Sequence, residues 1–212
     1  MADVEFFLDP VCPWAWITSR WIVEVQEHRG YDVQWRFISL AVINEGLVAD
    51  WYTPAYRRGH VAGFECLRVL DAVRLREGND GVAALYTSLG VAIHHDQRGD
   101  DLRNATMNLV GGALTAAGLD ATYADHLLDE SHDEHLRVET ALAFERTGKD
   151  VGTPIITFAP GTERESSFFG PVIASIPRGD EAVRLWDAIE LIATTSGMAE
   201  LKRSLRSKPV FD

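Results

Sequence analysis

The chain has 212 residues and a formal net charge of −12, with 20 Lys and Arg against 32 Asp and Glu. This balance argues against nucleic acid and anionic membranes as partners, since both require basic surface. A hydrophobic content of 46% can supply a sizeable core, and no apolar run approaches membrane-spanning length. The acidic stretch 1–5 lacks the basic and apolar regions of a signal peptide, so we expect a cytoplasmic location.

The first two predicted elements meet at Cys12. The apolar stretch 4–8 predicts a short buried strand, and residues 17–28 place apolar side chains at helical spacing. Pro13 follows Cys12 at the first helical position, where a missing N–H costs nothing. A thiol at such an exposed junction faces the unpaired amides of the helix start, which favour the thiolate and lower the pKa. We therefore predict that Cys12 is a nucleophile; the alternative is a small buried hydrophobic residue without chemistry.

A second strand is expected at residues 32–38, where polar and apolar residues alternate. Strand, helix and parallel strand would form a right-handed βαβ unit. The chain after this strand, residues 39–46, would pass near the Cys12 end of the sheet. Asn44 is therefore a candidate polar group near the thiol, or equally an ordinary turn residue.

The middle of the chain predicts helices and no strand, with breaks at residues 78–80, Gly99 and Gly118. The expected helices are 61–77, 81–93, 101–117, 121–129 and 134–147. This pattern predicts a helical insertion domain over residues 49–147, between two parts of a sheet domain at 1–48 and 148–212.

Apart from its histidines, the insertion contains two candidates for chemistry, Cys66 and an aromatic group around Tyr56. Cys66 lies among apolar residues of one helix and is expected in the core, with a resolving thiol as the minority alternative. A disulfide between Cys12 and Cys66 is disfavoured in a reducing cytosol. Tyr56, near Trp51 and Tyr52, is a candidate for a substrate-binding wall or for packing in a helix bundle.

The insertion contains two histidine groups that are candidates for metal ligands. His94-His95-Asp96 forms one group, and His132 and His135 form another. Adjacent histidines on a helix point in different directions, and the second pair lacks further ligands at matching spacing. The sequence therefore predicts no metal site.

The C-terminal part returns to strand patterns. Thr153-Pro154 precedes an expected strand at 155–158, and residues 163–169 supply its antiparallel partner. Residues 181–194 form a long amphipathic helix that should cover one face of the sheet, and residues 204–212 read as a tail.

The segment Cys12-Pro13-Trp14-Ala15 resembles the Cys-Pro-Trp-Cys motif of the DsbA-like branch of the thioredoxin superfamily. The resemblance is closest to the mycothiol-dependent nitroreductases of that branch. It covers most of the chain but weakens between about residues 48 and 139. The similar stretches are 9–20, 39–45, 150–154, 168–186, 200–203 and 211–212.

This resemblance implies an α/β thioredoxin fold with a large all-helical insertion, and a cis bond before Pro154. It further implies a thiol-disulfide oxidoreductase that uses a low-molecular-weight thiol, mycothiol, as its reductant and accepts nitro compounds. The family's resolving cysteine is Ala15 here, so a mixed disulfide at Cys12 needs an external thiol. Two origins stay open for Ala15: a naturally monothiol protein, or a replacement made to trap an intermediate.

Chain connectivity predicts a substrate cleft between the thioredoxin core and the insertion, because the insertion leaves the sheet after Leu40 and rejoins it just before Pro154. Its expected walls are Pro13, Trp14, Trp16, Asn44, Tyr56, His94, Thr153 and Pro154. Expected partners are the small-molecule thiol and its substrate, with a redoxin or disulfide-bearing protein as a further class. Whether the chain is a monomer or a homodimer stays open.

Two other function classes remain. Kappa-class glutathione transferases and hydroxychromene carboxylate isomerases share the inserted fold, but they place Ser where Cys12 stands. A non-catalytic binding protein is the third class, since Ala15 removes the second thiol.

Overall fold

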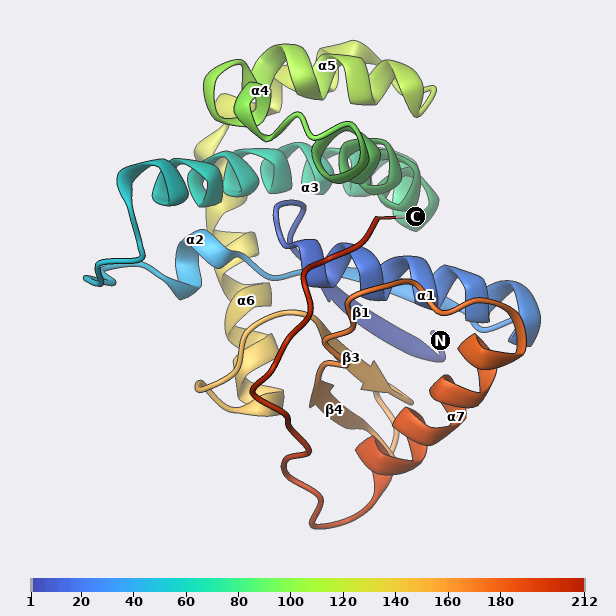
Figure 1. Cartoon of the computed structure of the whole chain (residues 1–212). Coiled ribbons are helices and arrows are strands. Elements are labelled where there is room, and N and C mark those ends of the chain that lie inside the picture. Colours follow the sequence, from blue (N-terminus) through green and yellow to red (C-terminus); the bar gives the residue numbers. More distant parts are fainter. Residues whose placement is uncertain (1, 212) are drawn as a thin grey trace. The chain divides into compact units, whose positions relative to one another are not determined.

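The computed structural model describes residues 2–211. Its chain divides into two compact units. We call them the sheet unit, residues 2–8, 13–36 and 143–211, and the helical unit, residues 9–12 and 37–142; Figure 1 labels their elements. The predicted domain limits at 48/49 and 147/148 stay a prediction. The compact units change at 36/37 and 142/143, and the four residues before Pro13 belong to the helical unit.

A four-stranded sheet has the order β2-β1-β3-β4. β1 pairs antiparallel with β3 with Phe7 opposite Ile155, and β3 pairs antiparallel with β4 with Ile155 opposite Phe169. The strands are β1 (Val4–Leu8), β2 (Val33–Phe37), β3 (Ile155–Phe158) and β4 (Ser166–Phe169). All four were predicted, and β2 shows the expected alternation of buried and half-buried residues.

Two long helices complete the sheet unit: α1 (Pro13–Arg29) and α7 (Gly179–Thr194), which pack against each other. The indole N–H of Trp21 donates to the carbonyl oxygen of Ala182 at 2.9 Å, and its ring lies 5.4 Å from that of Trp186. Trp186 also contacts Phe158 of β3, at 5.3 Å between ring centroids. These fully or almost fully buried aromatic rings join both helices and the sheet into one core.

The Thr153–Pro154 peptide bond is cis, as the resemblance implied. Thr153 is buried, and its hydroxyl donates to the carbonyl oxygen of Phe7 at 3.5 Å. Continuing the register of β1 and β3 places Pro154 beside Leu8, the last residue of β1. The cis proline therefore lies at the end of the strand from which the Cys12 segment departs.

The helical unit is built around α3 (Pro54–Gly90), which begins at the Thr53 cap and changes direction at Gly78, where φ is +72°. That conformation favours glycine, and Gly78 falls within the predicted break at 78–80. The other elements are α2 (Leu40–Ile43), η1 (Val91–His95), α4 (Gly99–Asn104), α5 (Thr106–Ala116), η2 (Ala121–Leu128), η3 (Glu130–His132) and α6 (Asp133–Thr147), which extends into the sheet unit.

Several helix predictions need correction. The expected helix 101–117 is two helices, separated at Ala105, where the backbone leaves the helical region. The expected helix 121–129 is the 3₁₀ helix η2, followed directly by the 3₁₀ turn η3. The carboxylates of Asp120 and Asp129 accept from amides two residues ahead, and such local bonds start tight turns in place of α-helix.

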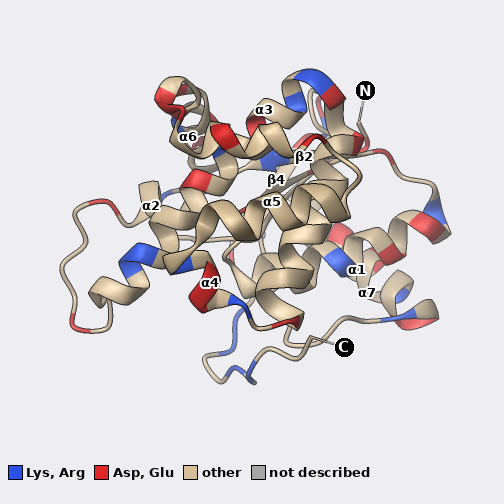
Figure 2. Cartoon of the chain, turned by 90° about the horizontal axis from the view of Figure 1, so that it is seen from above, with Lys and Arg blue, Asp and Glu red and all other residues tan. Residues whose placement is uncertain are grey.

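Charge is unevenly distributed along the described chain. α5 carries no charged residue, whereas residues 202–208 hold four of the 20 Lys and Arg and form the blue tail near the C-terminus in Figure 2. Among residues 2–211, no helix has the length and apolar character needed to span a bilayer.

Candidate functional site

Cys12 ends a four-residue turn, residues 9–12, that we call the thiol turn. Its backbone N–H donates to the carbonyl oxygen of Asp9 at 3.1 Å, and Pro13 follows as the first residue of α1. The predicted position before a helix is therefore confirmed. The expectation of an exposed thiol is wrong, because Cys12 is only 4% exposed.

Asp9 holds the thiol turn through its buried carboxylate. Oδ1 accepts from the backbone N–H of Val11 at 3.0 Å, and Oδ2 accepts from the backbone N–H of Leu40 at 2.7 Å. Leu40 begins α2, so this carboxylate ties the turn to the chain that follows β2. Burial raises the pKa of Asp9 to about 6, although the hydrogen bonds from the backbone amides of Leu40 and Val11 act to lower it.

His94 fixes the other side of the turn. Its Nε2 lies 3.0 Å from the carbonyl oxygen of Pro10, and a carbonyl only accepts, so Nε2 carries the proton and donates. Burial lowers the pKa of His94 to about 4, which keeps the ring neutral at pH 7. The sequence named His94 as a binding residue; the structure places it as an anchor of the thiol turn.

Gly63 lets α3 approach the thiol turn closely. A Cβ on Gly63 would lie 2.9 Å from Cγ1 of Val11 and 3.0 Å from Oδ1 of Asp9, closer than such contacts occur. Sequence reasoning missed both Gly63 and Asp9. For Asp9 a signal existed, since an aspartate directly after a buried strand commonly accepts from an amide two residues ahead.

The start of α1 contributes Trp14, Ala15 and Trp16 to the sheet unit. Trp14 is half-buried, whereas Ala15 is fully buried and Trp16 is 1% exposed. The guanidinium carbon of Arg20 lies 4.3 Å from the centre of the Trp16 ring. Trp16 is thus a core residue, and of the two tryptophans Trp14 is the one with surface to offer a ligand.

Asn44 and Tyr56 lie on different elements of the helical unit. Asn44 ends α2, and its side-chain amide donates to the carbonyl oxygen of Leu40 at 2.8 Å. It therefore has the turn role that the sequence left open. Tyr56 lies in the first turn of α3, is 53% exposed and contacts the rings of Trp51, Tyr52 and His60.

His60 packs against the rings of Tyr52 and Tyr56 in this aromatic group. Its Nδ1 lies 3.0 Å from the hydroxyl of Tyr52, and burial lowers its pKa to about 4. The ring is therefore neutral at pH 7 and supports Tyr52 through a hydrogen bond. Trp51 and Tyr56 are left as exposed aromatic surface on the helical unit.

Cys12 and Cys66 are not joined in a disulfide, in line with the sequence prediction. Cys66 lies on α3 with no exposed surface, and burial raises the pKa of its thiol. It is therefore the core residue that the sequence favoured. Residues able to hold a metal occur elsewhere in the helical unit, where His126, Asp129 and His132 converge.

Comparisons with known proteins identify the family of the chain. Residues 11–203 match the family described as Rv2466c-like, mycothiol-dependent nitroreductase Rv2466c. The chain is 31% identical over 205 residues to the uncharacterized protein Rv2286c of Mycobacterium tuberculosis, covering 96% of this chain and 82% of that protein.

A solved structure supports the fold. The chain is similar to the crystal structure of a probable DsbA oxidoreductase, SCO1869, from Streptomyces coelicolor, with a TM-score of 0.57. The identity is 17%, and the match covers 96% of this chain and 94% of that one. The fold is therefore a thioredoxin fold with a helical insertion, and the chain belongs to the Rv2466c-like family of mycothiol-dependent nitroreductases.

Proposed function

We propose that this chain is a cytoplasmic thiol-dependent oxidoreductase in which Cys12 is the nucleophile and mycothiol is the reductant. The observation that carries the proposal is the thiol turn: Cys12 lies directly before α1, in a turn whose Val11 N–H donates to the Asp9 carboxylate and whose Pro10 carbonyl accepts from His94. A cysteine that only filled space would not need a turn anchored on both sides. The family description supplies the low-molecular-weight thiol.

The proposed chemistry is monothiol, because Ala15 stands where the family has its second cysteine. The Cys12 thiolate attacks a disulfide RS–SR, forms Cys12–S–S–R and releases one RS⁻, which takes up a proton. A second small thiol, R′SH, then attacks the mixed disulfide. Cys12 is regenerated as a thiol, and RS–SR′ leaves.

Nitroaromatic compounds are the proposed electron acceptors. A two-electron step balances as ArNO₂ + Cys12–SH + RSH giving ArNO + Cys12–S–S–R + H₂O, and a further RSH restores Cys12 with release of RS–SR. Trp14 is the proposed contact for the flat ring, and Tyr56 is proposed separately as an aromatic contact on the helical unit. Pro13, Asn44, His94, Thr153 and Pro154 are proposed to shape the surroundings of the thiol.

The test is covalent labelling of Cys12. The protein is incubated with mycothiol disulfide or glutathione disulfide, and the mass of each peptide is measured. We expect one small thiol on Cys12, added faster from mycothiol disulfide, absent in Cys12→Ser and unchanged in Cys66→Ser. No adduct, or an adduct formed no faster than on free cysteine, would identify a binding protein instead.

The acceptor is tested separately with a nitroaromatic compound and excess mycothiol. Loss of nitro absorbance should require both the thiol and Cys12. Trp14→Ala and Tyr56→Ala should slow this reaction at least tenfold while changing alkylation of Cys12 by iodoacetamide little. Equal loss of both rates would mean that these aromatics support the thiol and do not bind the acceptor.

The same preparations address the partners. A redoxin or another disulfide-bearing protein would form a mixed disulfide with Cys12 that persists, because position 15 holds Ala and not a resolving cysteine. Sedimentation of the purified protein would decide between monomer and homodimer. The kappa-class alternative is not favoured, because Cys12 occupies the position that those enzymes give to Ser.

A further inference from the structure

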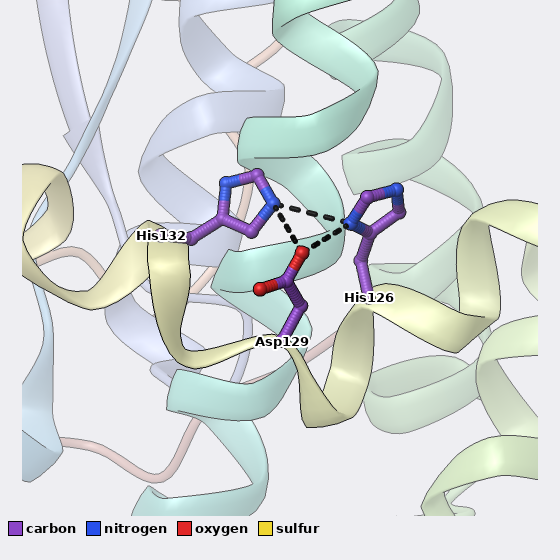
Figure 3. Close-up of side chains that lie close together, drawn as sticks. All are labelled: His126, Asp129 and His132. Carbon is purple, nitrogen blue, oxygen red and sulfur yellow. Dashed lines mark hydrogen bonds and ion pairs between the residues drawn. The ribbon is translucent and has the colours of Figure 1, made fainter.

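Three side chains of the helical unit converge at a place far along the sequence from the thiol turn. His126 lies on η2, Asp129 lies between η2 and η3, and His132 ends η3. A 3₁₀ helix has three residues per turn, so side chains spaced by three share one face. Figure 3 shows the two rings and the carboxylate directed at one another.

The three converging atoms form a nearly regular triangle. Nδ1 of His126 is 3.2 Å from Nε2 of His132 and 3.2 Å from Oδ2 of Asp129, and the remaining side is 3.7 Å. A circle through these atoms has a radius of about 2.0 Å, and Zn²⁺ holds imidazole nitrogen and carboxylate oxygen at about 2.0–2.2 Å. An ion slightly above the triangle would therefore reach all three atoms at bonding distance without movement of the backbone.

The positions of the protons on the two histidine rings favour a bound cation. Nδ1 of His132 lies 2.8 Å from Oδ2 of Asp71, which accepts, so in the neutral ring Nε2 presents a lone pair to the triangle. Nδ1 of His126 has at most one proton, and it faces two acceptors, the lone pair of His132 and the carboxylate of Asp129. That one proton cannot bond fully to both acceptors, whereas a metal ion can bind all three atoms when the neutral His126 ring carries its proton on Nε2.

Asp71 supplies the outer support that metal-binding histidines usually have. It is 1% exposed, accepts from His132 and forms a salt bridge of 2.7 Å with Arg74, which also pairs with Glu139. A carboxylate behind a ligating imidazole fixes the orientation of the ring and raises its basicity. The nearby pair of Arg68 and Asp133 is internally neutral, so Asp129 leaves the triangle with a net negative charge.

The site is also open to solvent on one side. The His132 side chain is 8% exposed, but the side chains of His126 and Asp129 are 32% and 41% exposed. An ion can therefore enter past these two residues, and solvent can supply its fourth ligand.

We propose that His126, Asp129 and His132 form a binding site for a divalent transition-metal ion of the Zn²⁺ class, with Asp71 as its outer-shell carboxylate. This site is independent of Cys12 and of the proposed redox reaction. It revises the expectation of no metal, which rested on pairing His132 with His135. The ion would join η2 to η3 and, through Asp71, to α3, so its role is to stabilise this part of the helical unit.

The test uses full-length protein without an affinity tag, in a Cys12→Ser background that removes zinc binding by the thiolate. Equilibrium dialysis against Zn²⁺ followed by elemental analysis should give one ion per chain, bound with micromolar or tighter affinity. Co²⁺ in place of Zn²⁺ should give the strong visible absorption of a tetrahedral ion. His126→Gln and Asp129→Asn should each raise the dissociation constant about tenfold or more.

The variants are chosen so that the fold survives. Asp129→Asn keeps an oxygen for the Ser131 amide, and His126 is partly exposed; buried His132 is left intact. The matched control is His135→Gln, because His135 also contacts Asp71, at 3.0 Å, but lies outside the triangle. Its dissociation constant should stay within about twofold of the parent.

Three results would overturn the proposal. One is no retained ion in the parent protein, which would make the triangle a hydrogen-bonded cluster only. A second is undiminished binding in both His126→Gln and Asp129→Asn. The third is a loss in His135→Gln as large as in those variants, which would centre any binding on Asp71 and His135 instead.

Discussion

The Nε2–H of His94 donates to the carbonyl oxygen of Pro10, which lies two residues before Cys12 and 84 residues before His94 in the sequence. The bond joins the end of the long helical run to the turn that carries the thiol. Because His94 is buried and neutral, it acts through position and not through charge. The thiol turn therefore depends on a residue of η1 that no local sequence pattern connects to it.

Removing this bond should loosen the thiol turn. His94→Ala leaves the Pro10 carbonyl without its donor, and an unsatisfied buried acceptor costs about 1–3 kcal/mol. We expect that loss in the free energy of unfolding measured with urea, together with an altered rate of Cys12 alkylation. His94→Gln can still donate and should recover part of both. Unchanged stability and unchanged alkylation of Cys12 in His94→Ala would refute the anchor role.

Asp9 should give the protein a distinct dependence on pH. Its folded-state pKa of about 6 lies above the ordinary value of 3.8, so folding favours the protonated form. The resulting stability is fully present below about pH 4 and is lost as the pH rises through 6, a change of about 3 kcal/mol. Asp9→Asn does not titrate, so relative to the parent its free energy of unfolding should rise by about that amount between pH 4 and pH 8.

This comparison isolates Asp9 because the buried histidines are present in both proteins. His60 and His94 have folded-state pKa values of about 4, below the ordinary 6.5, so their stability contribution is present above pH 6.5 and is lost as the pH falls through 4. Their effect has the opposite sign and cancels in the difference. A difference between parent and Asp9→Asn that does not vary with pH would contradict the assignment.

Gly63→Ala should separate packing against the thiol turn from helix propensity. The new methyl group would meet Val11 and Asp9 at about 3 Å, and overpacking of this kind costs about 1–3 kcal/mol. Gly59→Ala, one turn earlier on α3, meets nothing within 4 Å and should stabilise the protein by up to about 1 kcal/mol. Thermal unfolding of both variants measures the contrast, and a stabilised Gly63→Ala protein would argue against the close approach.

Ala15→Cys should convert the chain to a dithiol protein. Residues 12 and 15 are three apart at the start of a helix, a spacing that brings side chains within reach of a disulfide. Peptide mapping without reduction after mild oxidation should show a bond between positions 12 and 15. A bond from position 12 to Cys66 instead would contradict the core placement of Cys66.

Cys66 should be inert in the native protein. It has no exposed surface, and burial raises its pKa, so it stays a neutral thiol at pH 8. Alkylation followed by mass spectrometry should label Cys12 long before Cys66. The same reagent in urea should label both cysteines, which controls for the reagent; equal rates in native protein would refute the prediction.

The strands and the last helix could be predicted because their patterns are local. Alternation at 32–38 and the apolar stripe at 181–194 each follow from which face meets the core. The break at Gly78 was also visible, since only glycine adopts that backbone without strain. The cis bond before Pro154 came from the family resemblance, because X–Pro bonds in general are mostly trans.

The features that the sequence did not predict depend on contacts between distant residues or on the type of helix. His94 meets Pro10 only in the folded chain, and Gly63 is needed only because the thiol turn lies against it. The spacing of 126, 129 and 132 predicts a shared face in a 3₁₀ helix but a rotating one in an α-helix, and an α-helix was expected. The segment forms 3₁₀ helix in place of α-helix because the carboxylates of Asp120 and Asp129 accept from amides two residues ahead and start tight turns.

The thiol turn belongs to the helical unit, although the strand before it and the helix after it belong to the sheet unit. Its amides at Val11 and Cys12, and the Leu40 amide bound to Asp9, should therefore exchange with solvent when the helical unit opens, and not with the strands of the sheet. Hydrogen exchange at this turn therefore reports the free energy of opening of residues 37–142. A ligand that holds the helical unit closed would protect the cysteine from modification without touching it.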